Sequence, residues 1–397
     1  MRYRSGTAAI ICSIGVLALG ACGSSHGATG STSAAASSPA SGSTGKFSSP
    51  LKIAGLFDIQ GEDSYSDNSA ITAVQLAVDD INAHGGVGGL PVEFTRYKMT
   101  YDPSTALTGL LQAEGSSPSA IIGIDTTAIL VPLEQKLATG SAPVLAMVTD
   151  PPSQSKLSYP NNLFSFRAPP QLGSAAATQY LVDKFKPATA GLICVSDPFG
   201  TANCDADAKV LASNRVKIVA RVVSGITSTD ETTQAQAMRG ADIVLDEGYP
   251  GPIVLDVKAM TAEGLNVPVS AGASIAYATQ GLTSSQLSRL YGYADCLPAT
   301  FTSPPGSTVE AQYVAKMHQP MGGYTAHFYD AVIMVAQAAR RAGSPDPNKI
   351  AAELRTMSYQ GICSAYQAHQ YQIMVKSADI TQPRGSNGFV VVKPGPR

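Results

Sequence analysis

The stretch Leu51-Lys52-Ile53-Ala54-Gly55-Leu56-Phe57 opens the unit that decides the fold, because it is an apolar run as long as one buried strand. A polar loop follows at 58–68. Apolar residues then recur at the 3.6-residue period of one buried helix face, namely Ala70, Ala73, Val74, Ala77, Val78 and Ile81. We expect Asn68 or Ser69 to cap this helix and Gly85-Gly86 to end it.

A second strand pattern at 91–98 completes a β–α–β unit. The polar loop at 58–68 therefore lies at the carboxyl end of the first strand. Open α/β sheets bind their ligands at that end. Tyr65 lies in this loop.

The alternation of strand and helix patterns occurs twice along the chain. The first series has strands at 51–57, 91–98, 120–124 and 142–148, and the second has strands at 191–195, 216–223, 241–245 and 267–270. Alternating β and α segments favour parallel sheets covered by helices. The sequence therefore predicts an α/β protein with two Rossmann-like halves.

The N-terminal residues 1–22 are typical of a targeting segment. Two arginines precede an apolar core at 8–19 that is too short to span a membrane. The segment ends Leu19-Gly20-Ala21-Cys22, which resembles the lipobox of bacterial lipoproteins. The resemblance implies cleavage before Cys22 and lipidation of its thiol; an ordinary secretory signal is the alternative. Mass spectrometry of the mature N-terminus distinguishes the two.

Residues 23–49 consist almost wholly of Ser, Ala, Gly, Thr and Pro. Such a segment buries too little apolar surface to offset its ordering entropy, so we expect a flexible tether. A lipid followed by a tether would hold the folded body at the outer face of a membrane.

Composition sets limits on size and on partners. The part of the chain after the tether has about 350 residues, enough for two domains by the usual size of domains. The formal net charge is −2 and 44% of residues are hydrophobic. This balance provides no global field for nucleic acid, and no basic run with interleaved aromatic residues occurs.

Two of the six cysteines lie in 1–22, and four remain in the folded part. An even number in an exported protein favours disulfides, with three possible pairings. Cys194 ends a strand-like run and Cys204 follows closely, which favours a local pair and leaves Cys296 with Cys363. Free buried thiols are the alternative. The spacing of Cys and His supports no metal site.

The chain carries none of the common catalytic signatures. It has no Gly-x-Ser-x-Gly elbow, no His-Glu-x-x-His and no Gly-x-x-x-x-Gly-Lys-[Ser/Thr]. Gly86-Val87-Gly88-Gly89 follows a helix instead of a strand, so it is no dinucleotide fingerprint. We predict no catalytic residues and no cofactor.

Three stretches resemble a known family: Lys52-Ile53-Ala54-Gly55-Leu56, then Ala77-Val78-Asp79-Asp80-Ile81-Asn82 with Gly85-Gly86, and finally Tyr329-Asp330-Ala331. They are similar to type I substrate-binding proteins of ABC transporters, of the branched-chain amino acid (Leu/Ile/Val) kind. The resemblance covers the chain from Leu51 onward. It implies the type I periplasmic binding protein fold, in which two parallel-sheet lobes joined by a three-segment hinge close on a ligand.

By this resemblance, the chain crosses between lobes near 166–168, 297–301 and 364–370. The first lobe would comprise 50–167 plus 302–363, and the second would comprise 168–301 plus 364–397. Cys296 and Cys363 would then lie beside neighbouring crossings, which also favours their pairing.

The resemblance further implies a set of ligand contacts: Tyr65, Asp125, Thr126, Thr127, Thr149, Phe199, Tyr249 and Ser274. The loop 125–127 and Thr149 match places where hydroxyl and backbone N–H groups take a carboxylate. Tyr65 matches a wall, and Phe199 and Tyr249 match aromatic or hydroxyl contacts. An amino acid needs such donors and apolar walls, together with an acceptor for its ammonium.

One departure from the family concerns that acceptor. Amino-acid binders commonly place an acid in the loop that aligns with 271–274, and this chain has none there. Asp125, Asp246 and Glu247 are the candidates to replace it.

These features together predict a non-enzymatic, extracytoplasmic, lipid-anchored monomer that captures a small solute, an amino acid or a related compound. It would deliver that solute to an ABC permease in the membrane. A sensor that reports ligand occupancy to a membrane signalling partner is the alternative, and transport or signalling after gene deletion distinguishes the two.

Overall fold

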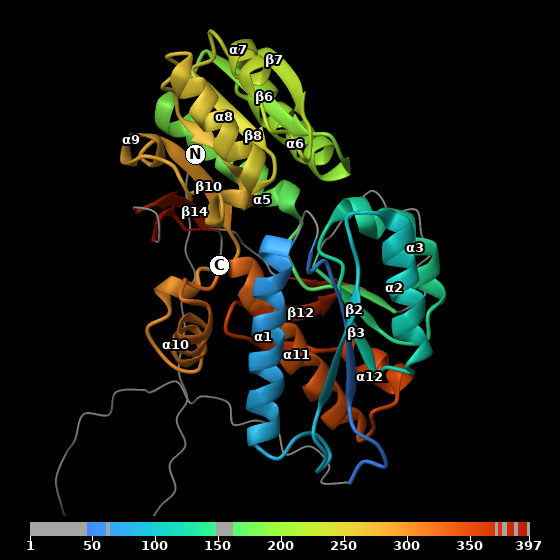
Figure 1. Ribbon diagram of the computed structural model, residues 1–397. Coiled ribbons are helices and arrows are strands. Elements are labelled where there is room, and N and C mark those ends of the chain that lie inside the picture. The colour runs from blue at the N-terminus through green and yellow to red at the C-terminus, as the bar shows by residue number, and fades with distance from the viewer. Residues whose placement is uncertain are drawn as a thin grey trace, which may run out of the picture. The chain divides into compact units, whose positions relative to one another are not determined.

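The computed structural model (Figure 1) describes residues 46–60, 64–147, 162–369, 372–374, 379–384 and 388–394. The predicted signal segment with Cys22, nearly all of the predicted tether, and Thr149 lie outside these residues. For Tyr65 the structure describes the backbone alone.

The first sheet has eight strands in the order β11-β12-β13-β5-β4-β3-β1-β2. Their bounds are β1 Lys52–Phe57, β2 Glu93–Lys98, β3 Ala120–Gly123, β4 Val144–Ala146, β5 Leu163–Ser165, β11 Ser358–Gln360, β12 Ala365–His369 and β13 Gln372–Met374. Strand β1 pairs in parallel with both β2 and β3, and Ile53 faces Phe94 on one side and Ala120 on the other. The central strands are parallel, and β3, β4 and β5 are buried along their whole length, as their apolar runs predict.

Six helices of the described chain belong with this sheet: α1 Ser64–Ala83, α2 Pro103–Gly115, α3 Thr127–Thr139, α10 Gly306–Met317, α11 Gly323–Ala342 and α12 Pro347–Leu354. Helix α1 begins at Ser64, so the prediction of a cap at Asn68 or Ser69 is wrong. The apolar pattern from Ala70 to Ile81 indicated only the part of α1 that packs on the core. The polar first turn is helical too: Ser66 and Asp67 are buried, Asp67 accepts from the Asp58 N–H in the loop after β1, and Ser66 donates to Asp125 after β3.

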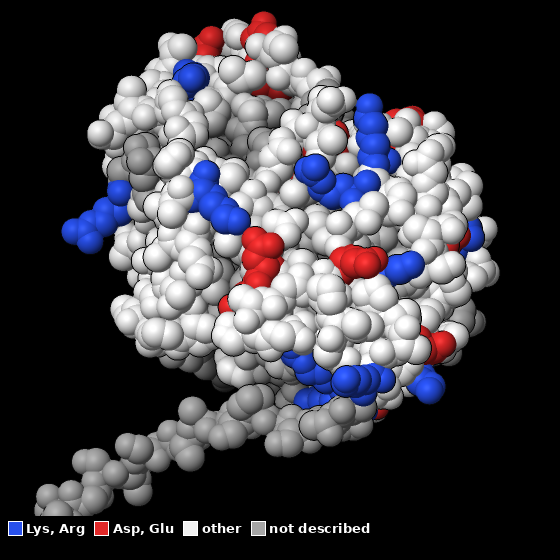
Figure 2. Space-filling model, turned by 60° about the horizontal axis from the view of Figure 1, so that its bottom comes forward, with Lys and Arg blue, Asp and Glu red and all other residues white. Residues whose placement is uncertain are grey.

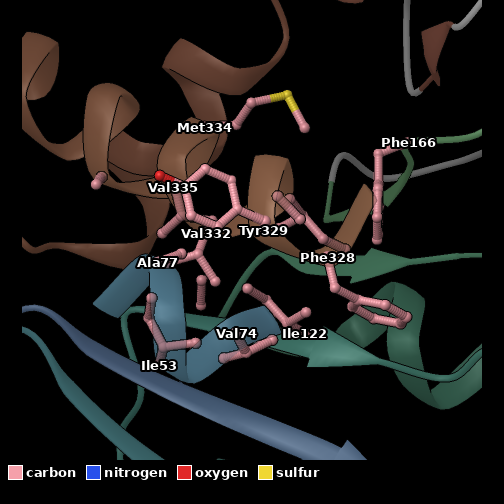
Figure 3. Close-up of a cluster of buried hydrophobic side chains, with 14 of the residues drawn as sticks. Ile53, Val74, Ala77, Ile122, Phe166, Phe328, Tyr329, Val332, Met334 and Val335 are labelled. Atoms are coloured by element: carbon pink, nitrogen blue, oxygen red, sulfur yellow. The ribbon is translucent and has the colours of Figure 1, made fainter. Parts of the chain in front are cut away.

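The core of this half lies between the sheet and the neighbouring helices α1 and α11, which run in the same direction: Ser66 and Tyr324 of their first turns both bond Asp125, and Arg340 of the last turn of α11 bonds the Gly86 carbonyl just after α1. Figure 3 shows Val332 and Val335 of α11 near Val74 and Ala77 of α1, above Ile53 of β1. Fourteen of the 20 residues of α11 are buried, as its continuous apolar run predicts. The helix ends at Gly343, whose φ of 59° is the left-handed conformation that glycine adopts without strain.

The second sheet has seven strands in the order β15-β14-β10-β9-β8-β6-β7. Their bounds are β6 Thr189–Val195, β7 Lys217–Ser224, β8 Ile243–Glu247, β9 Val269–Ser270, β10 Leu290–Ala294, β14 Asp379–Pro383 and β15 Phe389–Lys393. The helices that accompany it are α5 Pro170–Phe185, α6 Pro198–Ser213, α7 Thr232–Ala237, α8 Pro250–Ala262 and α9 Ser284–Leu287, with the 3₁₀ segments η1 Gly272–Ala276 and η2 Pro298–Thr300. The two α/β halves predicted from the alternating pattern are therefore present.

The chain passes from the first sheet to the second between β5 and α5, and it returns between β10 and α10. Both passages lie near the predicted crossings. The third crossing differs from the prediction at 364–370, because β12 and β13 extend the first sheet and Gln372 pairs with Ser165 of β5. The chain therefore changes sheet between Met374 and Asp379. A strand pattern reveals a strand but not the sheet that the strand joins.

Both expected disulfides are present. Cys194 of β6 bonds Cys204 of α6, with Cα atoms 6.1 Å apart, and Cys296 bonds Cys363, with Cα atoms 5.1 Å apart. Cys204 lies in the N-terminal half of α6, which Asp197 caps by accepting from the Gly200 N–H.

The surface offers no strongly charged region on the face that Figure 2 shows, where acidic and basic side chains are scattered among uncharged residues. Within the described ranges, no helix combines the length and the apolar character needed to cross a membrane. The same residues contain no group of His, Cys, Asp and Glu side chains arranged to hold a metal ion.

Candidate functional site

A cavity of about 80 Å³ lies where loops of both sheets meet. Its wall is formed by Ser66, Asp125, Thr126, Thr127, Met147, Arg167, Pro170, Phe199, Tyr249, Pro250, Ala273, Ser274, Tyr277 and Tyr324. The structure thus brings together Asp125, Thr126, Thr127, Phe199, Tyr249 and Ser274, which the sequence analysis selected from positions far apart in the chain.

The topology explains why these loops converge. Strand β1 lies between β3 and β2, and β6 lies between β8 and β7, so each sheet reverses its strand order at one point. Loops that leave the carboxyl ends of strands on either side of such a point diverge and leave a crevice. The residues after β3, β4, β6 and β8 therefore supply much of the cavity wall.

Asp125 is the acid of the cavity wall. Its Oδ2 accepts hydrogen bonds from the Tyr324 hydroxyl and, at 3.4 Å, from Ser66 Oγ. Burial raises the pKa of Asp125, and the nearby negative charge of Asp58 adds to that rise. A cationic group placed beside this carboxyl would offset both effects, so the site is suited to an ammonium.

Thr126 and Thr127 lie at the start of α3. Thr126 is the N-cap residue, but its side chain makes no capping hydrogen bond. Its Oγ1 is buried without a hydrogen-bond partner among the described residues. Helix N-termini carry free N–H groups and a partial positive charge, which favour anions. This end of α3 therefore offers a donor hydroxyl and a favourable field to a carboxylate.

Arg167 is the cation of the cavity wall, and the sequence analysis missed it. Its Nε donates to Asp295 Oδ2 at 2.7 Å, which links the first crossing to the second. Burial opposes the charge of each group, but the attraction between them outweighs it, so the pKa of Arg167 is raised and that of Asp295 is lowered. Arg167 also lines the cavity, with its guanidinium carbon 5.8 Å from the centroid of the Tyr324 ring, so its positive charge lies where an anion in the cavity would feel it.

Aromatic rings form a further part of the wall, and their hydrogen bonds connect the two halves. Phe199 stacks on Tyr249 with ring centroids 5.7 Å apart. The Tyr249 and Tyr101 hydroxyls donate to Asp197 Oδ2 at 2.7 Å and 2.9 Å. Because Tyr101 follows β2 of the first sheet and Asp197 follows β6 of the second, these bonds fasten the halves together beside the cavity.

Tyr277 and Tyr324 complete the wall, and neither was predicted. Tyr277 follows η1 and bonds the Thr325 Oγ1 across 3.0 Å, and Tyr324 lies in the first turn of α11. The sequence signal used for the other residues was a polar loop directly after a buried strand. These tyrosines and Arg167 follow no such loop, although Arg167 lies in a predicted crossing, where a charged residue is a useful sign.

Two of the three candidate replacement acids lie elsewhere. Asp246 and Glu247 end β8, but both are buried inside the second half and neither lines the cavity. The Asp246 carboxyl hydrogen bonds that of Asp256, and the Ser174 hydroxyl donates to Glu247 Oε1 at 3.2 Å. Of the three, Asp125 alone faces the cavity. Thr149 lies outside the described residues, and the position of the Tyr65 side chain is not described.

Two α/β halves joined by several crossings, with a polar cavity between the carboxyl ends of their strands, define a hinged solute-binding protein. The family model described as "Periplasmic binding protein" matches residues 50–386. The chain therefore belongs to the periplasmic binding protein family, and it has the type I fold of that family.

Relatives and solved structures agree with this assignment. The "Leu/Ile/Val-binding protein homolog 1" of Brucella suis is 23% identical over 290 residues, which cover 71% of this chain and 76% of the relative. A branched-chain amino acid transporter substrate-binding protein from Streptococcus pneumoniae, solved with isoleucine, has a TM-score of 0.76 and 20% identity, covering 87% of this chain and all of that one. A fatty acid ABC transporter substrate-binding protein from Thermomonospora curvata has a TM-score of 0.78 and 16% identity, covering 90% and 95%. At these identities the structural likeness establishes the fold alone.

Proposed function

We propose that this periplasmic binding protein captures a small solute that bears both a carboxylate and an ammonium, an amino acid or a close relative, in the cavity between its halves. The observation that carries the proposal is the presence of one buried acid, Asp125, and one partly buried cation, Arg167, in the wall of a single cavity of about 80 Å³. A solute with two opposite charges would complement both groups.

The carboxylate would bind at the start of α3 and at Arg167. Thr126 offers a buried hydroxyl without a partner among the described residues, next to helical N–H groups. The terminal nitrogens of Arg167 can donate to two carboxylate oxygens together, a geometry that gives orientation as well as strength.

The ammonium would bind Asp125, which takes the place of the acid absent from the loop 271–274. Aromatic walls from Phe199 and Tyr249 would cover the apolar part of the solute, and Ser274, whose hydroxyl donates to the Gly248 carbonyl at 2.8 Å, would border it. Thr149 and Tyr65 remain proposed contacts from the sequence.

Capture would serve transport. Relatives named as Leu/Ile/Val-binding proteins support delivery of the solute to an ABC permease. We further propose that Cys22 carries a lipid and that 23–49 tethers the body to the outer face of the membrane, as a monomer with a removable signal segment. We assign no reaction to the cavity.

A thermal-shift screen of the mature, unlipidated chain tests the proposal. A solute that binds only the folded state raises the melting temperature by mass action. We expect shifts with amino acids and none with the matching amines or alcohols. Shifts only with carboxylates that lack an amino group would reject the role of Asp125. If no amino acid or carboxylate shifts the melting temperature, the proposed capture of this solute class is rejected.

A further inference from the structure

A second and larger cavity lies directly beside the first. Its volume is about 760 Å³, within the range of roughly 300–1,000 Å³ that small-molecule sites occupy. Pro250 and Tyr277 line both cavities, so the two share a wall. The first cavity, at about 80 Å³, is smaller than the roughly 150 Å³ that houses one benzene molecule. A solute with a sizeable side chain therefore needs further room.

The two cavities differ in chemistry. The first holds Asp125 and Arg167. Among the described residues that line the second there is no Asp, Glu, Lys or Arg, and Val254, Leu297, Met321 and Phe389 provide apolar surface. One histidine and two glutamines are its polar side chains besides Tyr277. Charge is thus confined to one end of a pair of adjoining spaces, and the other end suits an uncharged group.

Tyr277 separates the two spaces. Its hydroxyl lies 3.0 Å from Thr325 Oγ1, and its ring packs against Gly322, where an added Cβ would collide with the hydroxyl. Its side chain is only partly buried, so a rotation of this one ring would connect the charged cavity with the uncharged one.

We propose that the second cavity receives the apolar tail of the solute whose charged head binds at Asp125 and Arg167. The preferred solute is then an amino acid with a long unbranched or aryl side chain, longer than that of leucine. The proposal rests on the proposed function, because the head must bind before the tail is placed.

A series of amino acids of increasing side-chain length tests the second cavity (the tail site) separately from the first cavity with Asp125 and Arg167 (the head site). Isothermal titration of the mature chain with straight-chain 2-amino acids, from norvaline to 2-aminodecanoate, is the main experiment. Each methylene that enters an apolar site should improve the affinity about fourfold. We therefore expect Kd to fall steadily beyond norleucine.

Two variants that fill the second cavity make the assignment specific. Val254→Trp places a large ring from α8 into the cavity, and Leu255→Trp, one residue further on and outside both walls in the described structure, is its control. Ala299→Trp fills the cavity from an exposed position that should not disturb folding, with exposed Thr300→Trp as its control. We expect Val254→Trp and Ala299→Trp to bind norvaline as the unaltered chain does, but their affinity should no longer increase with side-chain length. The two control variants should keep that increase.

The possible failures are distinct. If norvaline binds but affinity stays constant or falls with chain length, the tail site is wrong and the proposed function stands. If Ala299→Trp and Thr300→Trp lose the gain of affinity with side-chain length to the same extent, the tail site is also rejected. If no member of the series binds, the proposed function fails and the tail site fails with it.

Discussion

The crossing region and the interior of the second half bury carboxyl groups in opposite ways. At the crossings, Asp295 is held as an anion, because Arg167 donates to it at 2.7 Å. Inside the second half, Asp246 and Asp256 are buried beside each other, and burial raises the pKa of both. The negative charge of Glu231 adds to the rise at each, and that of Asp246 adds at Asp256, whose pKa rises to about 11. The crossing region therefore stabilises a buried carboxylate with a cation, whereas the interior of the second half keeps its buried carboxyl groups protonated.

A second pair of acids repeats the pattern of the interior. Asp207 accepts from Ser174 Oγ at 2.5 Å and from Thr178 Oγ1 at 2.6 Å, and burial raises its pKa to about 6. Burial also raises the pKa of the neighbouring Glu247. Buried acids are therefore not by themselves signs of a ligand site in this chain, and the cation at the crossings marks the cavity better.

The two regions are also fastened by different disulfides, and this gives the largest expected effect. Cys296–Cys363 closes a separation of 67 residues and Cys194–Cys204 a separation of 10. In the chain-entropy account, removing the first should lower the free energy of unfolding by about 4 kcal/mol and removing the second by about 3 kcal/mol. Urea unfolding of the two double Cys→Ser variants measures both. A larger loss from the short loop would contradict the account.

Removing the cation at the crossings should lower the free energy of unfolding nearly as much as removing Cys296–Cys363. Arg167→Met leaves the carboxylate of Asp295 buried without its partner, and breaking a buried pair in this way typically costs about 3–5 kcal/mol. We expect about 3 kcal/mol, because His327 Nε2 also lies 3.3 Å from Asp295 Oδ2. The same urea assay applies, with Arg167→Met/Asp295→Leu as the compensated control. If the double variant is no more stable than Arg167→Met, the pairing does not explain the loss.

The free energy of unfolding, measured as a function of pH, should distinguish the two regions, because their contributions change with pH in opposite directions. The pKa of Asp256 rises from 3.8 to about 11 on folding, so the unfolded chain loses this proton first. The protonated interior is then most stabilising below about pH 4, and the free energy of unfolding falls as the pH rises toward 11. Asp295 acts in the opposite direction, because its lowered pKa makes its contribution disappear in strong acid.

Asp256→Asn isolates the interior. Its stability relative to the unaltered chain should increase steadily from pH 5 to pH 9, because the unfolded variant no longer gains stability by losing a proton at this position. The exposed Asp183→Asn is the control and should change neither value. A parallel loss at both pH values would show that Asp256 acts through packing instead of protonation.

Much of the fold could be predicted from the sequence, because the relevant signals are local. The apolar run Lys52–Phe57 and the buried α11 have the periods of a strand and a core helix. The sheet membership of β12 and β13 could not be predicted, since it depends on pairing with β11 and β5 across the chain. The start of α1 was missed for a similar reason, because its polar first turn is fixed by contacts from other loops.

The candidate site divides in the same way. Asp125, Thr126, Phe199 and Tyr249 directly follow buried strands, and topology brings the ends of such strands together. Arg167, Tyr277 and Tyr324 reach the cavity from a crossing, from beyond η1 and from a helix start. Their approach depends on how the two sheets are joined, which no local pattern encodes.

The most direct test of the central claim is the affinity of Asp125→Asn for the amino acid that the screen selects, compared with its analogue without the amino group. Asparagine keeps the shape of the side chain and one acceptor oxygen but not its charge. Isothermal titration should show a loss of about 30-fold to 100-fold for the amino acid, a typical cost for a buried charge pair, and little change for the analogue. Unchanged affinity for the amino acid would contradict the assignment of Asp125 as the ammonium partner and, with it, the proposed solute class.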